Sequence, residues 1–307
     1  MTAYVQHKGP TGPSSAQTRG LSSRIWGRLP IKNWSVGLGG RYYFDDFLNF
    51  GGANIASAAG TISPTTTTDI DNDTKANNSN ASLVNAITRA ATGYDIYTDV
   101  GVTIAGLATE STGVIEVAGN DADNDEGIMQ TGGGSGNMVA IDATGAGRIA
   151  FECRIKKASI GDNGLSFFVG LAEEGLAAAD TLVDNTGALA SKDMIGFSVL
   201  QDNGEELDFT WRTAGQTTQV HANVADMVAD TYMKMGFLYD PGNHPDDKKI
   251  KIFIDNGVEE SVYVTQTNLD AATFPDDEEL SLLLATKVGT AAESKLQMDW
   301  WALGVED

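Results

Sequence analysis

The sequence predicts an all-β protein, in which one antiparallel β-sandwich follows an extended N-terminal arm. Many short runs of residues alternate between apolar and polar, and turn-forming residues separate them, which is typical of the strands of a sandwich. Glycine is abundant and proline is rare, with 35 and 7 residues among 307. Helical patterns do not alternate with the strands, so the sequence disfavours a parallel βαβ fold.

The N-terminal arm is predicted over residues 1–40. Residues 1–20 are polar and are expected to be coil, whereas residues 21–40 interleave apolar side chains with Arg and Lys. Pro30 and several glycines disfavour a long helix in this stretch. We therefore expect an extended arm that buries its aromatic side chains against another surface.

Charge distinguishes the arm from the rest of the chain. Residues 1–44 contain six basic and no acidic residues, although the whole chain has 20 basic and 42 acidic residues and a net charge of −22. Such an asymmetry fits either a disordered basic tail or an arm that docks on another subunit. The negative total argues against a nucleic-acid partner, because proteins of that class place cations opposite phosphates.

The body is predicted over residues 41–307. RYYFDDFLNF at 41–50 is dense in aromatic residues and is the first expected strand, and a polar insertion follows at about 51–82. Residues 82–91 have apolar residues at helical spacing and predict one short helix. The next two expected strands are 101–107 and 113–119, with loops at 120–127 and 131–137.

The strand signal is strongest after residue 138, where nine short apolar or alternating runs are separated by turn-rich spacers. Asn256-Gly257 lies between two of these runs and supplies the positive φ values of a tight turn, which predicts a β-hairpin. The nine expected strands are 148–157, 164–173, 194–201, 206–213, 231–240, 249–255, 258–264, 279–288 and 295–304.

The order of these runs carries a resemblance to a known fold family. FFVGLAEEG, IGFSVL, DFTWR, YMKMGFLYD, KIKIFIDNG and KLQMDWWALG follow one another, and this succession resembles the concanavalin A-like (laminin-G-like) jelly roll. The resemblance covers about half of the chain, and its motifs are generic to the fold and specify no activity. It implies a jelly-roll β-sandwich in which RYYFDDFLNF pairs with KLQMDWWALG.

The arrangement as a whole also resembles the structural proteins of tailed-phage virions. An Arg-rich arm leads into a Phe-Asp-Asp-Phe opening at 44–47 and then into a body rich in Gly, Ala, Thr and Asn. The resemblance implies a non-enzymatic virion protein of the capsid decoration or cement type, made in the host bacterial cytoplasm. Its partners would be the major capsid protein or another virion subunit, together with further copies of itself.

The arm would then bind a groove of a neighbouring subunit. Arg24, Arg28 and Lys32 would meet acidic groups there, while Trp26 and Trp34 would be the buried anchors, since Trp and Arg dominate interface energetics. An arm that becomes ordered on binding loses conformational entropy but covers a large surface.

The sequence contains no recognisable enzyme constellation, and no cofactor is expected. His7, His221 and His244 are too scattered to suggest a metal triad or a catalytic base. The glycines around Ser135 do not have the spacing of a nucleophile elbow, and no phosphate-binding loop is present. The paired carboxylates of the retaining glucanases of this fold are missing, and the alternation around Glu152 suggests that its side chain faces away from the core.

Membrane and disulfide signals are also missing from the sequence. No run of 18 apolar residues and no signal-peptide pattern occurs, so we expect no membrane partner. Cys153 is the single cysteine, which excludes an intrachain disulfide and predicts a buried free thiol.

Two alternatives remain open from the sequence. Asp-rich loops at 69–80 and 121–127 begin with the spacing of a calcium loop but lack its glycine and closing glutamate, so solvated turns are the simpler interpretation. A carbohydrate-binding module or tail-associated adhesin is the alternative function. In that case Asp208 and Arg212 would bind a glycan, whereas Phe209 and Trp211 would more simply face the core.

Overall fold

The computed structural model describes residues 20–47, 94–99, 101–107, 113–119, 122–131, 138–141, 147–242, 248–255, 258–276, 278–290 and 295–307. Among these residues no helix is long and apolar enough to cross a membrane. The expected short helix at 82–91 and the polar insertion at 51–82 lie outside the described residues, as do residues 1–19.

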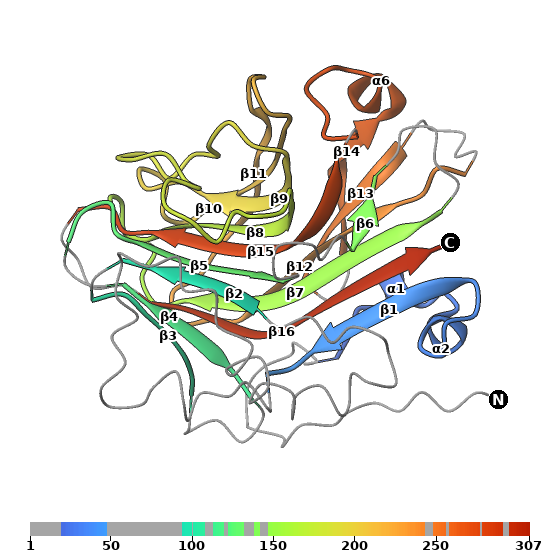
Figure 1. Cartoon of the computed structure of the whole chain (residues 1–307), viewed down its shortest axis with the longest axis horizontal. Coiled ribbons are helices and arrows are strands. Elements are labelled where there is room, and N and C mark those ends of the chain that lie inside the picture. The colour runs from blue at the N-terminus through green and yellow to red at the C-terminus, as the bar shows by residue number, and fades with distance from the viewer. Residues whose placement is uncertain are drawn as a thin grey trace.

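Two antiparallel sheets pack face to face and confirm the predicted β-sandwich (Figure 1). The β7 sheet has the strand order β14-β13-β12-β7-β16-β4-β3, with β1 paired to β16. Its strands are β1 (Gly40–Asp45), β3 (Thr103–Gly106), β4 (Ile115–Ala118), β7 (Ile149–Lys157), β12 (Met233–Tyr239), β13 (Lys248–Ile254), β14 (Val258–Thr265) and β16 (Lys295–Glu306).

The β8 sheet has the strand order β11-β10-β9-β8-β15-β5-β2, with β6 paired to β15. Its strands are β2 (Tyr94–Thr98), β5 (Glu126–Thr131), β6 (Val139–Ala140), β8 (Ser166–Ala172), β9 (Met194–Val199), β10 (Glu206–Arg212), β11 (Gln219–Asp226) and β15 (Glu279–Lys287). The short helices are α1 (Ser23–Trp26), α2 (Ile31–Trp34) and α6 (Gln266–Leu269).

The implied pairing between the first strand and the last strand is confirmed. β1 runs antiparallel to β16, with Gly40 opposite Glu306 and Asp45 opposite Trp301. The hairpin is confirmed as well, because Ile254 of β13 lies opposite Val258 of β14. The Asn256-Gly257 turn itself is outside the described residues.

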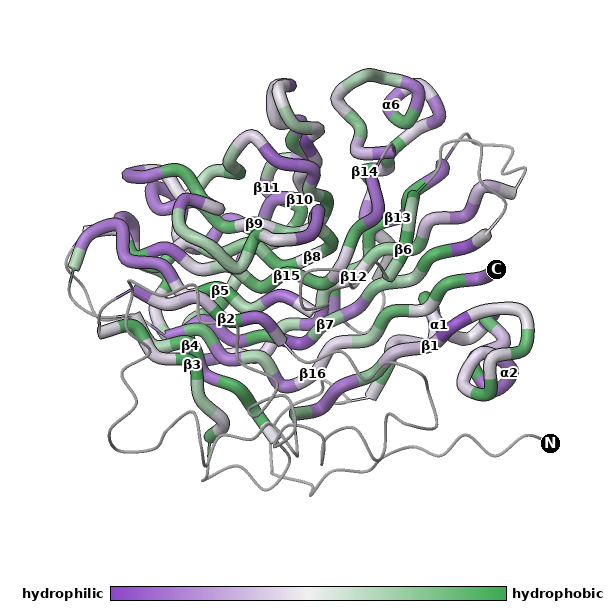
Figure 2. The backbone as a smooth tube through the Cα atoms, viewed as in Figure 1, coloured by the Kyte–Doolittle hydropathy of each residue, from purple (hydrophilic) through white to green (hydrophobic). Residues whose placement is uncertain are grey.

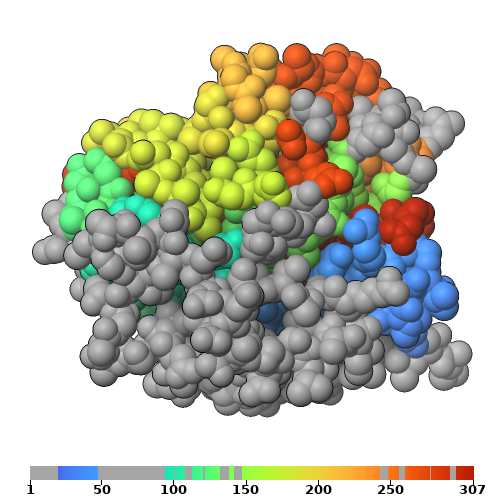
Figure 3. All heavy atoms as spheres, in the orientation of Figure 1, coloured from blue at the N-terminus to red at the C-terminus, as the bar shows by residue number. Residues whose placement is uncertain are grey.

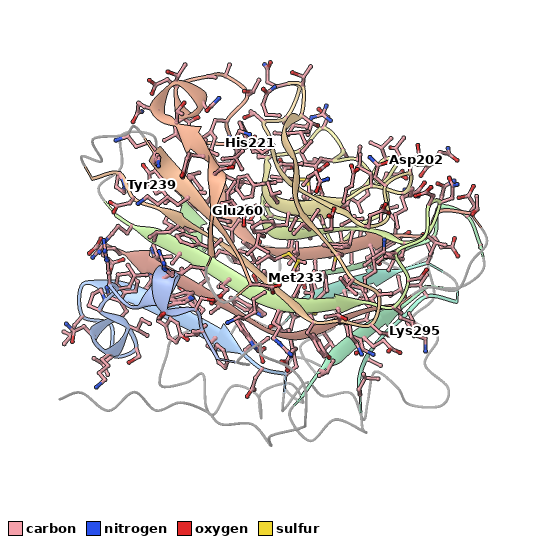
Figure 4. The ribbon with its side chains drawn as sticks, turned by 180° about the vertical axis from the view of Figure 1, so that it is seen from behind. Asp202, His221, Met233, Tyr239, Glu260 and Lys295 are labelled. Carbon is pink, nitrogen blue, oxygen red and sulfur yellow. The ribbon has the colours of Figure 1, made fainter. Side chains whose placement is uncertain are left out.

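The main core fills the space between the two sheets. Phe151 and Phe237 of the β7 sheet lie 5.5 Å apart between ring centroids, and Phe209 of the β8 sheet lies 5.8 Å from Phe237. Cys153 is fully buried among them, as predicted, and burial raises the pKa of its thiol well above its usual value. In Figure 4, Met233 and Tyr239 mark the two ends of β12, which faces this core.

Strand interiors carry much of the apolar sequence, and several of the loops are hydrophilic (Figure 2). The central strands are nevertheless buried on both faces: eight of the nine positions of β7 are buried, as are all seven of β8. A half-exposed sheet would alternate in burial. Other parts of the chain must therefore cover the outer faces.

A polar chain links the two sheets near the start of the body. The indole nitrogen of Trp301 donates to the Tyr94 hydroxyl at 2.8 Å, and that hydroxyl donates to Asp45 Oδ2 at 2.6 Å. The Phe47 backbone amide donates to the other oxygen of Asp45 at 2.7 Å, and the Phe47 and Tyr94 rings lie 6.1 Å apart. The two described residues that flank positions 48–93 are therefore in contact with each other.

Candidate functional site

The candidate site is the N-terminal segment, residues 20–39, together with the sheet face that it covers. These residues were expected to form the inner part of an extended arm outside the body. They form two helical turns instead, α1 and α2, interrupted at Pro30, which cannot continue a helix. Figure 1 shows both helices beside β1, and Figure 3 shows the segment as part of the surface next to the C-terminal strand.

The segment packs on the outer face of the β7 sheet through its own apolar cluster. The segment is not an extended arm because its large apolar side chains pack on an apolar surface of the same chain. The buried members of this cluster are Ile25, Trp26, Leu29 and Trp34 from the segment and Ala150, Phe253, Trp300 and Ala302 from the strands. Trp26 and Trp34 are 3% and 2% exposed.

Small residues on three strands make room for these side chains, and we call this surface the trough: Ala150 (β7), Gly236 (β12), Ala302 and Gly304 (β16). A Cβ atom on Gly304 would lie 2.9 Å from ring atoms of both Trp26 and Trp34. A Cβ atom on Gly236 would lie 2.9 Å from the Cδ1 atom of Ile25. Gly304 is therefore needed where the tryptophan rings lie, whereas a Cβ atom on Gly236 would first meet the Phe151 carbonyl oxygen of β7.

Two buried charged residues beside these small residues, Glu152 and Lys234, bind the segment, and we include them in the trough. Glu152 is 1% exposed and its Oε2 accepts hydrogen bonds from the Ser22 amide at 3.0 Å and the Trp26 indole at 2.8 Å. Lys234 is also 1% exposed, and its Nζ donates to the Gly20 carbonyl at 3.0 Å. Glu152 faces away from the core, as its alternation predicted.

Burial decides the direction of both pKa shifts. Desolvation raises the pKa of Glu152, and the hydrogen bonds from Ser22 and Trp26 and the positive charge of Lys234 oppose that rise. Desolvation lowers the pKa of Lys234, and Glu152 opposes that change. Each charge thus costs free energy when the segment covers it, and the hydrogen bonds to the segment offset part of that cost.

The five predicted partner-binding residues divide into two groups. Trp26 and Trp34 are buried against the chain's own sheet, whereas Arg24, Arg28 and Lys32 are exposed. The tryptophans are therefore anchors within the chain, and the three cations form the outer surface. Binding of another subunit by these cations stays a prediction.

Exposed basic side chains are concentrated on this part of the structure. Across the residues that the structure describes, the exposed Lys and Arg residues are Arg24, Arg28, Lys32 and Arg41; all other described Lys and Arg are buried or half-buried. Arg41 pairs with Asp307 at 3.3 Å. Two apolar residues of the same segment, Val36 and Leu38, are 63% and 64% exposed.

The outer face of the β8 sheet is covered by the loop of residues 173–193, whose leucines pack on it. Buried Glu126 accepts from the amides of Asp180 at 2.6 Å and Leu182 at 3.0 Å. Buried Lys287 lies 3.3 Å from Glu126 Oε1, and its Nζ donates to the Leu182 carbonyl at 2.8 Å and to Asp184 Oδ1 at 2.5 Å. Sequence reasoning missed this ion pair, because its partners are distant in the chain.

The four residues considered for a glycan-binding face make their contacts within the chain. Phe209 and Trp211 are buried at 0% and 2% exposure and face the core, as the simpler interpretation predicted. Arg212 donates to the Leu189 carbonyl of the covering loop at 2.8 Å, and Asp208 accepts from the Asn223 amide at 2.8 Å.

Of the three histidines, only His221 is among the described residues. Its ring lies 5.2 Å from that of Trp211, and its Nε2 atom is 3.1 Å from the Tyr263 carbonyl. His221 thus connects β11 and β14, the terminal strands of the two sheets, and Figure 4 labels it together with Glu260 of β14. Burial lowers its pKa, a change that the contact with Tyr263 opposes.

The two Asp-rich loops are described only in part. The loop at 69–80 and Asp121 lie outside the described residues, whereas Asp123 and Asp125 lie within them. In the described part of the chain, no group of three or more His, Cys, Asp or Glu side chains is placed to hold a metal ion.

No protein-family model and no curated protein matches this sequence. Several solved structures are similar to part of this chain. A glucuronan lyase from the fungus Trichoderma reesei is 10% identical, with a TM-score of 0.46 over 69% of this chain and 91% of that one. The potassium-bound carbohydrate recognition domain of Emp46p is 10% identical, with a TM-score of 0.46 over 68% of this chain and 87% of that domain.

A phage protein has a similar level of likeness. A carbohydrate esterase from the Shiga toxin-encoding bacteriophage phi24B is 13% identical, with a TM-score of 0.40 over 70% of this chain and 91% of that one. Similarity at this level says nothing of activity, since one sandwich fold hosts many activities. The strand pairings of this chain themselves define the two-sheet antiparallel jelly-roll β-sandwich that the sequence predicted.

Proposed function

We propose that this chain is a non-enzymatic structural protein of a virion, of the capsid decoration type, and that its basic segment surface contacts a neighbouring virion subunit. We define the basic segment surface as Arg24, Arg28 and Lys32. The observation that carries the proposal is the concentration of exposed cations on one docked segment of a chain whose net charge is −22. A surface of this kind steers association with an acidic partner.

The anchoring of the segment supports the same proposal. Trp26 and Trp34 fix the segment on the β7 sheet, so the three cations are presented from an ordered scaffold instead of a free tail. Preorganisation of this kind reduces the entropy lost on binding. The covering of the outer faces of the two sheets also favours a structural role over a carbohydrate-binding module or adhesin that binds its glycan on a sheet face.

The test is co-sedimentation of the tagged chain with virus particles made in the same cells. The variant Arg24→Glu/Arg28→Glu/Lys32→Glu should disappear from the particle fraction while its circular dichroism is unchanged. A matched control is Lys248→Glu/Lys249→Glu/Lys251→Glu, which changes the net charge equally but lies on β13. Binding of the wild-type chain should weaken as salt rises, since exposed charges are screened.

Three outcomes would count against the proposal. Absence of the wild-type chain from particles would refute the virion role. Equal incorporation of both charge variants would refute the role of the basic segment surface. Retention of the chain on a glycan array, unchanged in the segment variant, would favour the carbohydrate-binding alternative.

A further inference from the structure

The trough is constructed as a binding site for a peptide segment. The buried charges Glu152 and Lys234 direct hydrogen bonds to the backbone at Gly20 and Ser22 and to the Trp26 indole. Gly304 leaves space for the tryptophan rings. These features together recognise an extended backbone followed by a helical turn that presents an indole.

The segment can separate from the body without opening the main core. It contributes no strand, and its side chains belong to a cluster distinct from the one between the sheets. Residues 35–39 connect α2 to β1, and Gly37 and Gly39 in this connection have φ values of 74° and 71°, which glycine adopts most readily. Glu152 and Lys234 would regain water on separation, so an empty trough leaves no buried charge without hydration.

We infer that the trough of one copy binds the segment of a second copy, so that copies of this chain link by exchanging residues 20–34. A second copy has the same segment, so its tryptophans and backbone fit the trough equally well. Exchange of an identical element between copies is a low-cost route to assembly. Charge favours the approach as well, because the segment surface is basic while the rest of the chain is strongly acidic. This inference does not depend on the proposed virion role.

Docking within one copy competes with exchange. The short connection keeps the segment of each copy at a high effective concentration near its own trough. Exchange is therefore expected where copies are crowded or where the trough of the same copy is blocked. Blocking the trough of one copy by substitution therefore allows the inference to be tested with the full-length chain.

The experiment combines two complementary full-length variants. Gly304→Val blocks the trough but keeps the segment; the three nearest atoms to a Cβ at that position are all tryptophan ring atoms of the segment. Trp26→Ala/Trp34→Ala keeps an open trough but removes the anchors. Each variant alone should sediment as a monomer of 32.4 kDa, and their equimolar mixture should form a species of twice that mass.

Controls separate exchange from general association. Adding Trp26→Ala/Trp34→Ala to the Gly304→Val chain should abolish the mixed dimer, because no intact segment remains. Adding Glu152→Ala to the open-trough chain should weaken the mixed dimer about tenfold, because the Ser22 amide and the Trp26 indole lose their acceptor. A mixture that remains monomeric with both variants folded overturns the inference, as does a dimer that survives loss of the tryptophans. The milder pair Gly304→Ala and Trp34→Ala gives the same test if a variant does not fold.

Discussion

Removal of the Lys287 side chain tests whether the covered face of the β8 sheet depends on one buried ion pair. Lys287 and Glu126 are each 1% exposed, and Lys287→Met would leave the Glu126 carboxylate buried without its cation. Breaking a buried pair from one side costs about 3–5 kcal/mol. Asp180 and Asp184, whose side chains are 85% and 55% exposed, add little to this figure because water screens them.

The cost should depend on pH in a defined direction. Burial raises the pKa of Glu126, and Lys287 is one of the groups that lower it, so the pKa should rise further in the variant. A carboxyl group whose pKa is raised in the folded state contributes stability below its unfolded pKa and loses it as pH rises through the folded value. The variant should therefore be most destabilised at neutral and higher pH, with a smaller loss toward acid pH.

Urea unfolding at about pH 5 and about pH 8 measures this difference. The double variant Lys287→Met/Glu126→Gln should recover part of the loss at the higher pH, because no charge remains buried. Amide hydrogen exchange should become faster in residues 173–193, because this loop is hydrogen-bonded to both Glu126 and Lys287. A pH-independent loss below about 1 kcal/mol would refute the reasoning.

The remaining predictions concern the segment and the single thiol. Trp26→Ala should release the segment rather than unfold the body, so limited trypsin digestion should cleave after Arg24 and Arg28 much faster than in the wild-type chain; protection equal to the wild type would contradict this. Glu152 has a pKa raised by burial, so docking should weaken as pH rises through that pKa. Tryptophan fluorescence of the folded chain should follow this change, and Glu152→Gln should abolish it. Cys153 should react with a thiol reagent only after urea unfolding, because it is fully buried and its pKa is raised.

Local patterns in the sequence predicted most of the sandwich. The nine runs after residue 138 are strands, because alternation and turn chemistry act over a few residues. β11 was missed, because Val220 on this edge strand is 48% exposed and its neighbours are largely polar, which leaves little alternation to detect. β5 was missed because its short apolar run follows an Asp-rich stretch that dominates the local composition.

The candidate site could be predicted only in part. The sequence indicated that Trp26 and Trp34 would be buried and that nearby cations would be exposed. It could not indicate which surface would bury the tryptophans, because that depends on Gly236 and Gly304 lying on strands far away in the sequence. The alternation of apolar and polar residues predicted that the Glu152 side chain faces away from the core. It did not predict which segment covers that side chain.

The contact between Phe47 and Tyr94 makes the body suitable as a display scaffold. Whatever chain occupies positions 48–93 begins and ends at the same point, which Asp45, Tyr94 and Trp301 fix by hydrogen bonds. Lengthening a stretch of chain whose flanking residues are held together costs only about 0.6 kcal/mol for each doubling of its length. A foreign domain with closely spaced termini should be accepted there.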